Sequence, residues 1–170
     1  EKSIKAVTAP IPVPSGLIIA RQVPRLGETA SAVAGLGWGP GLGPAIPIRP
    51  CQVCAVPRQV AALLLTSGQA VAMAAACVPP SVPVFAVGDR TAQKAREAGF
   101  TTVYSAHGNA QALEHLLCQQ CAPALGSLLL FSGVGQGMEL AASLRAQGFR
   151  VVRRVAYRAD PVGALPALVD

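Results

Sequence analysis

Short apolar runs alternate with helix-like segments from residue 60 to residue 159, and this alternation restricts the fold more than any other feature of the chain. The expected strands are VAALLLTS (60–67), VPVFAVG (82–88), TTVYSA (101–106), GSLLLFSG (126–133) and RVVRRVAYRA (150–159). The segments between them begin GQAVAM, DRTAQK, GNAQAL and GMELAA, and each has helical character over roughly ten residues. Strands separated by helices of this length form parallel sheets, so the sequence predicts an α/β fold.

The chain before residue 60 is less regular. EKSIKAVTAPIPVPS (1–15) has three prolines and no periodicity, so we expect a flexible tail there. GLIIAR (16–21) is typical of a short strand and LGETASAVAGLG (26–37) of a helix, whereas the prolines of GPAIPIRP (43–50) favour an edge strand or a linker. We therefore predict a partial β-α-β unit over 16–50 and a larger α/β unit over 51–160.

The charge balance narrows the choice of partner. Lys and Arg outnumber Asp and Glu by 14 to 8, which gives a net charge of +6 and suits an acidic partner. A nucleic-acid surface usually combines clustered Lys and Arg with aromatic side chains for stacking. Aromatic residues make up only 4% of this chain, and the tightest basic cluster, RVVRRVAYR (150–158), falls in an expected strand. We therefore expect a small polyanion as partner and no nucleic acid.

The stretch 60–88 contains no charged residue, which raises the question of a membrane span. A spanning helix needs about 20 predominantly apolar residues. TSGQ and three prolines interrupt this stretch, so strand, turn, short helix and strand describe it better. No charged and apolar leader opens the chain, and we expect a cytoplasmic protein without a membrane segment.

Five cysteines form two CxxC pairs, Cys51 with Cys54 and Cys118 with Cys121, and leave Cys77 alone. The pairs of a zinc ribbon lie about 15–20 residues apart, far closer than these two pairs do. His115 lies one turn before Cys118 and is a possible third ligand. Because the pairs fall in unlike elements, we predict reduced thiols and no metal site.

Small polar residues follow four of the expected strands and precede helices. In open α/β sheets ligands bind beyond the carboxyl ends of the strands, where helix N-termini attract anions. We therefore predict a ligand site at that edge, although each turn alone also fits an ordinary helix cap. The candidate residues are Thr66, Ser67, Gly68, Gly88, Asp89, Arg90, Thr91, Gly108, Asn109, Ala110, Ser132 and Gly133.

The glycine-rich turn GVGQGM (133–138) matches neither common phosphate-binding motif. A dinucleotide fingerprint needs a third glycine where Met138 stands, and a P-loop needs Lys and Ser or Thr after its last glycine. No GxSxG is present, and neither histidine has an obvious carboxylate partner in the sequence. The residues alone thus indicate an anion-binding edge without evident nucleophilic machinery.

The order of these motifs resembles the uroporphyrinogen-III synthase family. LLLTSGQAV, PVFAVGDRTAQKAREAGF, HGNAQALEHLL and SLLLFSGVGQGMELAASLRAQGFRVVRRVAYRAD follow one another as the family's motifs do, and GLIIARQVPRLGETASAVAGLGWGPGLGPAIPI is similar to its first β-α-β. The resemblance covers about residues 16–170 and implies two parallel-sheet lobes, with the second complete and the first partial. It implies that 161–170 begin a linker back to the first lobe.

The resemblance also implies a function. The family substrate is hydroxymethylbilane, a linear tetrapyrrole with eight carboxylates, which is cyclised with inversion of its last pyrrole ring without metal or cofactor. Thr66 and Ser67 match the family's Thr-Ser turn, Thr91 its threonine, and Asn109 its G-N-A helix start. Tyr157 matches the tyrosine proposed to assist loss of the hydroxyl, although a strand-end tyrosine also fits a core position. A full-length member would act as a monomer.

Two positions depart from the family pattern, because Ser132 and Gly137 stand where members often carry arginines. The first lobe would also lack strands that bear part of the active cleft. We therefore expect the 170-residue chain by itself to be a poor or inactive synthase. The alternative is a non-catalytic α/β module that binds a small polyanion.

Overall fold

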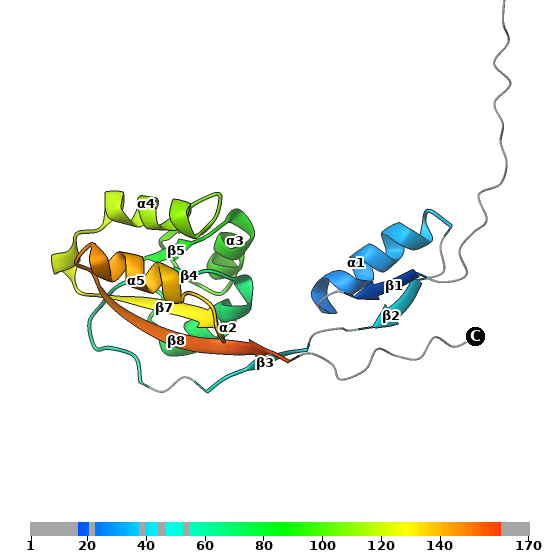
Figure 1. Ribbon diagram of the computed structural model, residues 1–170, viewed down its shortest axis with the longest axis horizontal. Coiled ribbons are helices and arrows are strands. Elements are labelled where there is room, and N and C mark those ends of the chain that lie inside the picture. Colours follow the sequence, from blue (N-terminus) through cyan, green and yellow to red (C-terminus); the bar gives the residue numbers. More distant parts are fainter. Residues whose placement is uncertain (1–16, 21–22, 38–39, 44–46, 53–54, 161–170) are drawn as a thin grey trace, which may run out of the picture. The chain divides into compact units, whose positions relative to one another are not determined.

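The computed structural model describes residues 17–20, 23–37, 40–43, 47–52 and 55–160, which form two units (Figure 1). One unit comprises residues 1–47 and 160–170, and the other comprises residues 48–159. No helix in the described part of the chain combines the length and the apolar character that are needed to cross a membrane.

The smaller unit contains a parallel pair of strands joined by a helix. Strand β1 (Leu17–Ala20) is followed by α1 (Val23–Ala34) and then by β2 (Pro40–Gly43). The register runs from Leu17 opposite Pro40 to Ala20 opposite Gly43. The expectation of a β-α-β unit holds here, but its second strand begins earlier than the predicted segment 43–50. Pro40 is the first residue of its strand, a position at which a missing N–H costs little.

The larger unit is built on one six-stranded sheet with the order β3-β8-β7-β4-β5-β6. Strands β4 to β8 are parallel to their neighbours among themselves, as the strand and helix alternation predicts, and β3 is antiparallel to β8. The strands are β3 (Ile48–Pro50), β4 (Val60–Leu65), β5 (Val84–Ala86), β6 (Val103–Ser105), β7 (Ser127–Gly133) and β8 (Arg150–Ala159).

Strand β3 corrects one expectation. Residues 43–50 were predicted to belong to the first lobe, whereas Ile48–Pro50 form the edge strand of the second sheet and pair with β8. The pairing continues past Pro50, because the Cys51 amide donates to the Ala156 carbonyl at 2.9 Å. A proline is tolerated in this strand because its missing N–H is not needed at a sheet edge.

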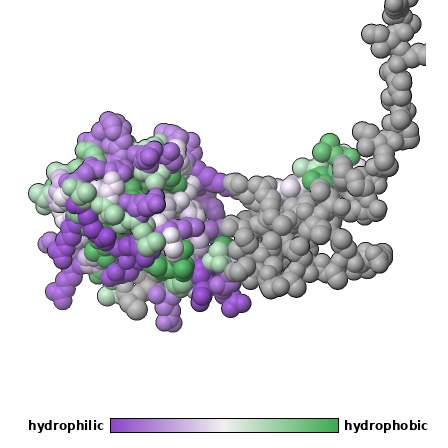
Figure 2. Space-filling model, in the orientation of Figure 1, coloured by the Kyte–Doolittle hydropathy of each residue, from purple (hydrophilic) through white to green (hydrophobic). Residues whose placement is uncertain are grey.

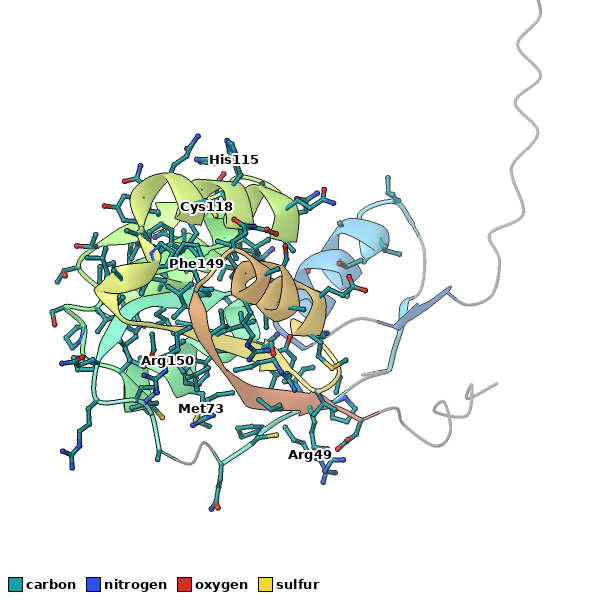
Figure 3. All side chains as sticks on the ribbon, turned by 60° about the vertical axis from the view of Figure 1, so that its left-hand side comes forward. Arg49, Met73, His115, Cys118, Phe149 and Arg150 are labelled. Carbon is teal, nitrogen blue, oxygen red and sulfur yellow. The ribbon has the colours of Figure 1, made fainter. Side chains whose placement is uncertain are left out.

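Helices cover both faces of the sheet (Figure 1). The strands are buried on both sides, so Leu63 and Leu65 pack into one core while Leu64 packs into the other. Met73 and Phe149 lie on these opposite sides (Figure 3). Helices α2 (Val71–Cys77) and α3 (Asp89–Glu97) cover the first side, and α4 (Ala110–Gln120) and α5 (Met138–Ala146) cover the second.

Two short 3-10 helices complete the unit, η1 (Gly68–Ala70) before α2 and η2 (Pro123–Leu125) before β7. Hydrophilic side chains cover much of the visible face, with apolar patches between them (Figure 2). The carboxyl ends of β4, β5, β6, β7 and β8 lie at one edge, because these strands are parallel.

Candidate functional site

The structure brings the four predicted polar turns to one edge of the sheet. Across the sheet, the turn after β7 comes first, followed by the turns after β4, β5 and β6. The turns begin at Ser132, Thr66, Gly88 and Gly108, respectively. The expected arrangement is therefore confirmed, while the role of these residues in binding stays a prediction.

A pocket of about 390 Å³ opens at this edge, beside the turn between β7 and α5. Of the predicted site residues, Thr66 and Ala110 line it. The other lining residues come from the glycine-rich turn and the start of α5, which sequence reasoning examined only for phosphate motifs. They are Gly135, Gln136, Gly137, Met138, Glu139 and Leu140.

Thr66 has a buried hydroxyl group without a hydrogen-bond partner among the described residues. Leaving a buried hydroxyl unpaired costs about 1–3 kcal/mol, so native structures rarely do it without a reason. Thr66 is also one of the residues that line the pocket.

The turn between β7 and α5 is held by a buried serine and an arginine. Ser132 is fully buried, and its hydroxyl donates to the Gln136 carbonyl at 2.9 Å. The Arg153 guanidinium, from β8, donates to the same carbonyl at 3.1 Å and to the Ser132 hydroxyl at 3.3 Å. Gly137 must be glycine because its φ is +74° and an added Cβ would lie 3.1 Å from Ser132 Cβ. Ser132 therefore does not line the pocket itself but stabilises the turn whose residues do.

Tyr157 occupies the core position that the sequence left open, and its assistance in loss of the hydroxyl stays a prediction. Its ring is only 6% exposed and packs in the core with Leu129 and Phe131. Its hydroxyl reaches the glycine-rich turn and donates to Gln136 Oε1 at 3.0 Å. Tyr157 is not one of the residues that line the pocket, so its hydroxyl approaches the pocket through Gln136.

Ser67 and Asn109 act first as helix caps. The Ser67 hydroxyl accepts from the Gln69 amide at 3.3 Å, and Asn109 Oδ1 accepts from the Ala112 amide at 3.0 Å. The capping alternative that the sequence left open is thus correct for these oxygens. A ligand at these turns would meet backbone N–H groups more readily than these two side chains.

Lys94 is a candidate that sequence reasoning missed. Its side chain crosses from α3 to the Thr-Ser turn, so that a Cβ on Gly68 would lie 2.9 Å from Lys94 Cδ. This contact brings a cation to the carboxyl edge of β4. Lys94 lies one helical turn after Thr91, so its place on the same face of α3 could have been noted from the sequence. Its contact with the turn at Gly68 depends on the tertiary fold and could not be predicted.

The turns after β5 and β6 are joined. The Gly108 amide donates to the Val87 carbonyl at 3.0 Å, which ties the start of α4 to the end of β5. Gly88 is the N-cap of α3, and its carbonyl accepts from the Thr91 amide at 3.1 Å. Thr91 is 7% exposed, so it supports this turn from the interior.

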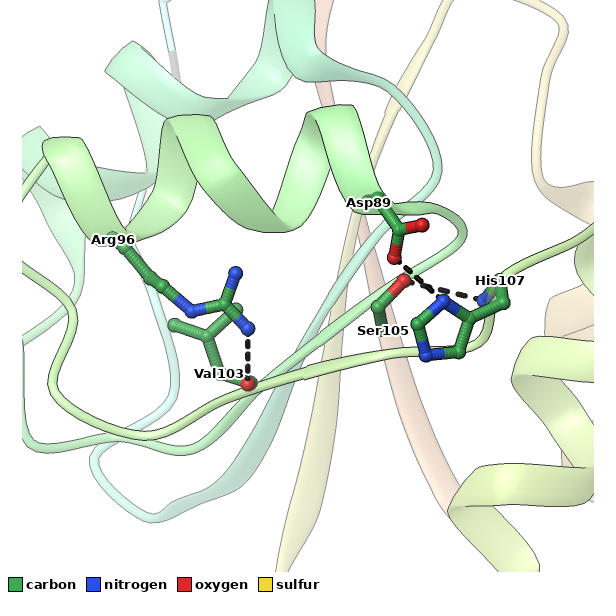
Figure 4. Close-up of polar contacts among 5 residues, drawn as sticks. All are labelled: Asp89, Arg96, Val103, Ser105 and His107. Atoms are coloured by element: carbon green, nitrogen blue, oxygen red, sulfur yellow. Dashed lines mark hydrogen bonds and ion pairs between the residues drawn. The ribbon is translucent and has the colours of Figure 1, made fainter.

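Asp89 and His107 form an ion pair that the sequence did not reveal (Figure 4). Asp89 Oδ1 lies 2.7 Å from His107 Nδ1, and both side chains are exposed. His107 has a φ of 52°, which is unusual for a residue with a side chain, and its amide donates to the Ser105 hydroxyl at 3.2 Å. Hydrogen bonds from the Ser105 and His107 side chains hold the pKa of Asp89 below its ordinary value.

The cysteine pairs show no metal geometry in the described part of the chain, where no three His, Cys, Asp or Glu side chains are grouped to bind an ion. Cys54 lies outside the described residues. Cys118, on α4 with His115 (Figure 3), donates its thiol to Gln147 Oε1 at 2.8 Å. Burial raises the pKa of the Cys118 thiol, and the Glu114 carboxylate raises it further. Independence from metal stays a prediction.

These features define a class of protein. An open, mostly parallel sheet with helices on both faces and a pocket at its carboxyl edge is the arrangement in which α/β domains bind ligands. The family model described as uroporphyrinogen-III synthase HemD matches residues 27–170. The chain therefore belongs to the uroporphyrinogen-III synthase family, as its motif order predicts.

Solved structures agree with this fold. A mutant uroporphyrinogen III synthase from the extremely thermophilic bacterium Thermus thermophilus is 20% identical with a TM-score of 0.58, and the match covers 87% of this chain and 64% of that one. The uroporphyrinogen-III synthetase from Helicobacter pylori is 17% identical with a TM-score of 0.55, covering 75% and 58%. The chain thus spans less than two thirds of either relative. No curated protein sequence matches it.

Proposed function

We propose that this chain supplies the second-lobe part of a uroporphyrinogen-III synthase site, which cyclises hydroxymethylbilane to uroporphyrinogen III with inversion of the last pyrrole ring. The observation that carries the proposal is the pocket at the carboxyl edge, which Thr66 lines together with Gln136, the hydrogen-bond partner of Tyr157. Family membership supports it, and by their place in the order of motifs Thr66 and Tyr157 resemble the family's Thr-Ser turn and tyrosine.

The edge offers suitable groups for a molecule with eight carboxylates. Helices α3, α4 and α5 begin there, and their first N–H groups favour negative charge. Lys94 and His107 add side chains that carry positive charge or hydrogen-bond donors at the turns after β4 and β6. Met138 and Val134, each 58% exposed between the end of β7 and the start of α5, offer apolar contacts to pyrrole rings.

The proposed reaction involves no net oxidation or reduction. The bond between the terminal methylene carbon and its hydroxyl oxygen breaks, the oxygen takes up a proton and leaves as water, and the methylene carbon bonds to the substituted α-carbon of the last pyrrole to give a spiro intermediate. The existing bridge bond to that α-carbon then breaks, and the freed bridge carbon bonds to the other α-carbon of the ring, which releases its proton. Tyr157 is the candidate to assist departure of the hydroxyl, and the sheet edge holds the chain in the shape that permits inversion. The chemistry as proposed calls for neither metal nor cofactor.

A second candidate function is a non-catalytic module that binds a small polyanion. The burial of Tyr157 favours it, since the phenol does not line the pocket. For either function we propose a cytoplasmic protein that binds no nucleic acid, since basic residues are not accompanied by aromatic ones, and that acts as a monomer in its full-length form.

One experiment separates these functions. Hydroxymethylbilane is mixed with the 170-residue chain, binding is followed by stopped-flow absorbance before cyclisation, and the porphyrins are separated after oxidation. Saturable binding with type III above the protein-free background, even at a low rate, supports the synthase. Binding with only type I product supports the non-catalytic module. Absence of binding contradicts both.

A further inference from the structure

Gln136 connects the buried tyrosine to the pocket. Its Oε1 accepts the hydroxyl hydrogen bond of Tyr157 at 3.0 Å, and the same residue lines the pocket. The carboxamide nitrogen carries two further N–H donors, and these have no hydrogen-bond partner among the described residues. One end of the carboxamide is therefore engaged by the protein, while the other is available to a ligand.

The backbone of Gln136 is fixed more firmly than its exposed position suggests. Its carbonyl accepts from the Ser132 hydroxyl and from the Arg153 guanidinium. Gly137 follows in the left-handed region, which sets the start of α5. Residues of β7 and β8 thus hold the main chain of Gln136, and the Tyr157 hydroxyl holds its Oε1. The side chain is therefore oriented before a ligand arrives, which reduces the entropy lost on binding.

The charge of the pocket indicates which part of a bilane it would accept. Among its lining residues, all within the described chain, Glu139 is the one that carries a charge. Glu139 lies in the first turn of α5, where its carboxylate offsets the partial positive charge of that helix start. Since no cationic side chain of the described chain lines the pocket, it offers the acetate and propionate groups of the substrate no charged partner. The neutral hydroxymethyl terminus is the part of the molecule that fits this environment.

We infer that Gln136 is a substrate-binding residue whose amide N–H groups bind the hydroxymethyl oxygen of the bilane next to the Tyr157 hydroxyl. This inference rests on the proposed function. It assigns the pocket to the terminus that reacts, and it leaves the carboxylates to Lys94 and to the start of α3 along the rest of the edge. Met138 and Leu140, which also line the pocket, then face the last pyrrole ring.

If Gln136 binds the substrate hydroxyl, the protein should distinguish a bilane with this hydroxyl from one without it, which a purely structural role of Gln136 would not cause. A site that donates a hydrogen bond to a substrate hydroxyl binds the analogue without it less tightly. A net hydrogen bond contributes roughly 0.5–1.5 kcal/mol, so we expect hydroxymethylbilane to bind about three- to tenfold more tightly than the bilane with a terminal methyl group.

The test compares binding of these two bilanes by stopped flow to wild type, Gln136→Leu, Gln136→Glu and Gln119→Leu. Gln136→Leu removes both ends of the carboxamide, whereas Gln136→Glu keeps an acceptor for Tyr157 and removes the N–H donors. Gln119 is the matched control, an exposed glutamine near the far end of α4 that contacts His115. Circular dichroism shows whether each variant is folded, which we expect because Gln136 is an exposed turn residue.

We expect both Gln136 variants to lose the preference for the hydroxymethyl form and Gln119→Leu to keep it. Retention of the preference in the Gln136 variants overturns the inference. Equal binding of the two bilanes by wild type also overturns it, while the proposed function stands. If wild type binds neither bilane, the proposed function itself fails.

Discussion

The ring of Tyr157 occupies the space that a side chain at Gly133 would need, since a Cβ on Gly133 would lie 2.9 Å from both Cε2 and Cζ of the ring. In the pairing of β7 with β8, Ser132 lies opposite Val155 and the next residue, Gly133, lies opposite Tyr157. Ala156 is therefore an extra residue on β8, which makes a β-bulge. Such a bulge turns the following side chain to a different face. It therefore directs the Tyr157 hydroxyl to Gln136.

Gly133→Ala should destabilise the protein by about 1–3 kcal/mol, because the added methyl group overpacks a filled space. Urea unfolding of the two proteins measures the difference. In the background Tyr157→Leu the same change should cost less, because the ring is gone and the two substitutions are coupled. Equal costs in both backgrounds would contradict the packing explanation.

Thr66→Val should leave stability unchanged or slightly increased, because the hydroxyl that it removes is buried and has no partner in the described chain. Bilane binding should weaken by about three- to tenfold, if the ligand completes that hydrogen bond. Thr66→Ser keeps the hydroxyl and should bind nearly as wild type does. Thermal unfolding and the stopped-flow assay provide the two measurements. A large loss of stability in Thr66→Val would show that the hydroxyl is already paired.

Arg153→Leu should loosen the turn between β7 and α5, because the guanidinium donates to the Gln136 carbonyl and the Ser132 hydroxyl. We expect a loss of about 1 kcal/mol in unfolding free energy, together with faster amide hydrogen exchange in residues 134–138. Arg150→Leu, an exposed arginine at the start of the same strand, is the control for lost charge. Similar exchange rates in the two variants would argue against the anchoring role.

Asp89 should make stability depend on pH in the acid range. Its folded pKa lies below its ordinary value of 3.8 through hydrogen bonds from Ser105 and His107, so the unfolded chain binds more protons there. The stabilisation is present above the ordinary pKa and is lost as the pH falls through the folded pKa. Unfolding at pH 6 and pH 3 should show a larger decrease for wild type than for Asp89→Asn. The effect is small, because the pair is exposed.

Cys118 and Cys121 should react slowly with iodoacetamide at pH 8. Burial raises the pKa of both thiols, the Glu114 carboxylate adds to the effect at Cys118, and Cys118 adds to it at Cys121. The thiolate is the reactive form, so a higher pKa lowers the rate. Glu114→Gln should speed alkylation of Cys118 modestly, as mass spectrometry of the labelled peptides would show. A Cys118 rate above that of free cysteine would contradict the prediction.

Much of the candidate site could be predicted because its turns are local. Strands such as VAALLLTS and GSLLLFSG end in polar residues that begin helices, and parallel strands must carry these ends to one edge. The pocket residues Gln136 and Met138 were not predicted, because a turn that matches no phosphate motif gives no further signal. Gln136 meets Tyr157 of β8, and both pocket residues share the lining with Thr66, which follows β4; these partners lie far away in the sequence.

Which segments of the larger unit become strands and helices follows from the sequence alone, because apolar periodicity and helix caps act over a few residues. The order of the motifs likewise identifies the family. Three features arise only in the folded chain: Ile48–Pro50 joins the second sheet, Asp89 meets His107, and the bulge at Ala156 directs Tyr157 to Gln136. Each of these depends on the pairing of distant segments, which is set by the burial of whole faces against one another and leaves no local pattern in the chain.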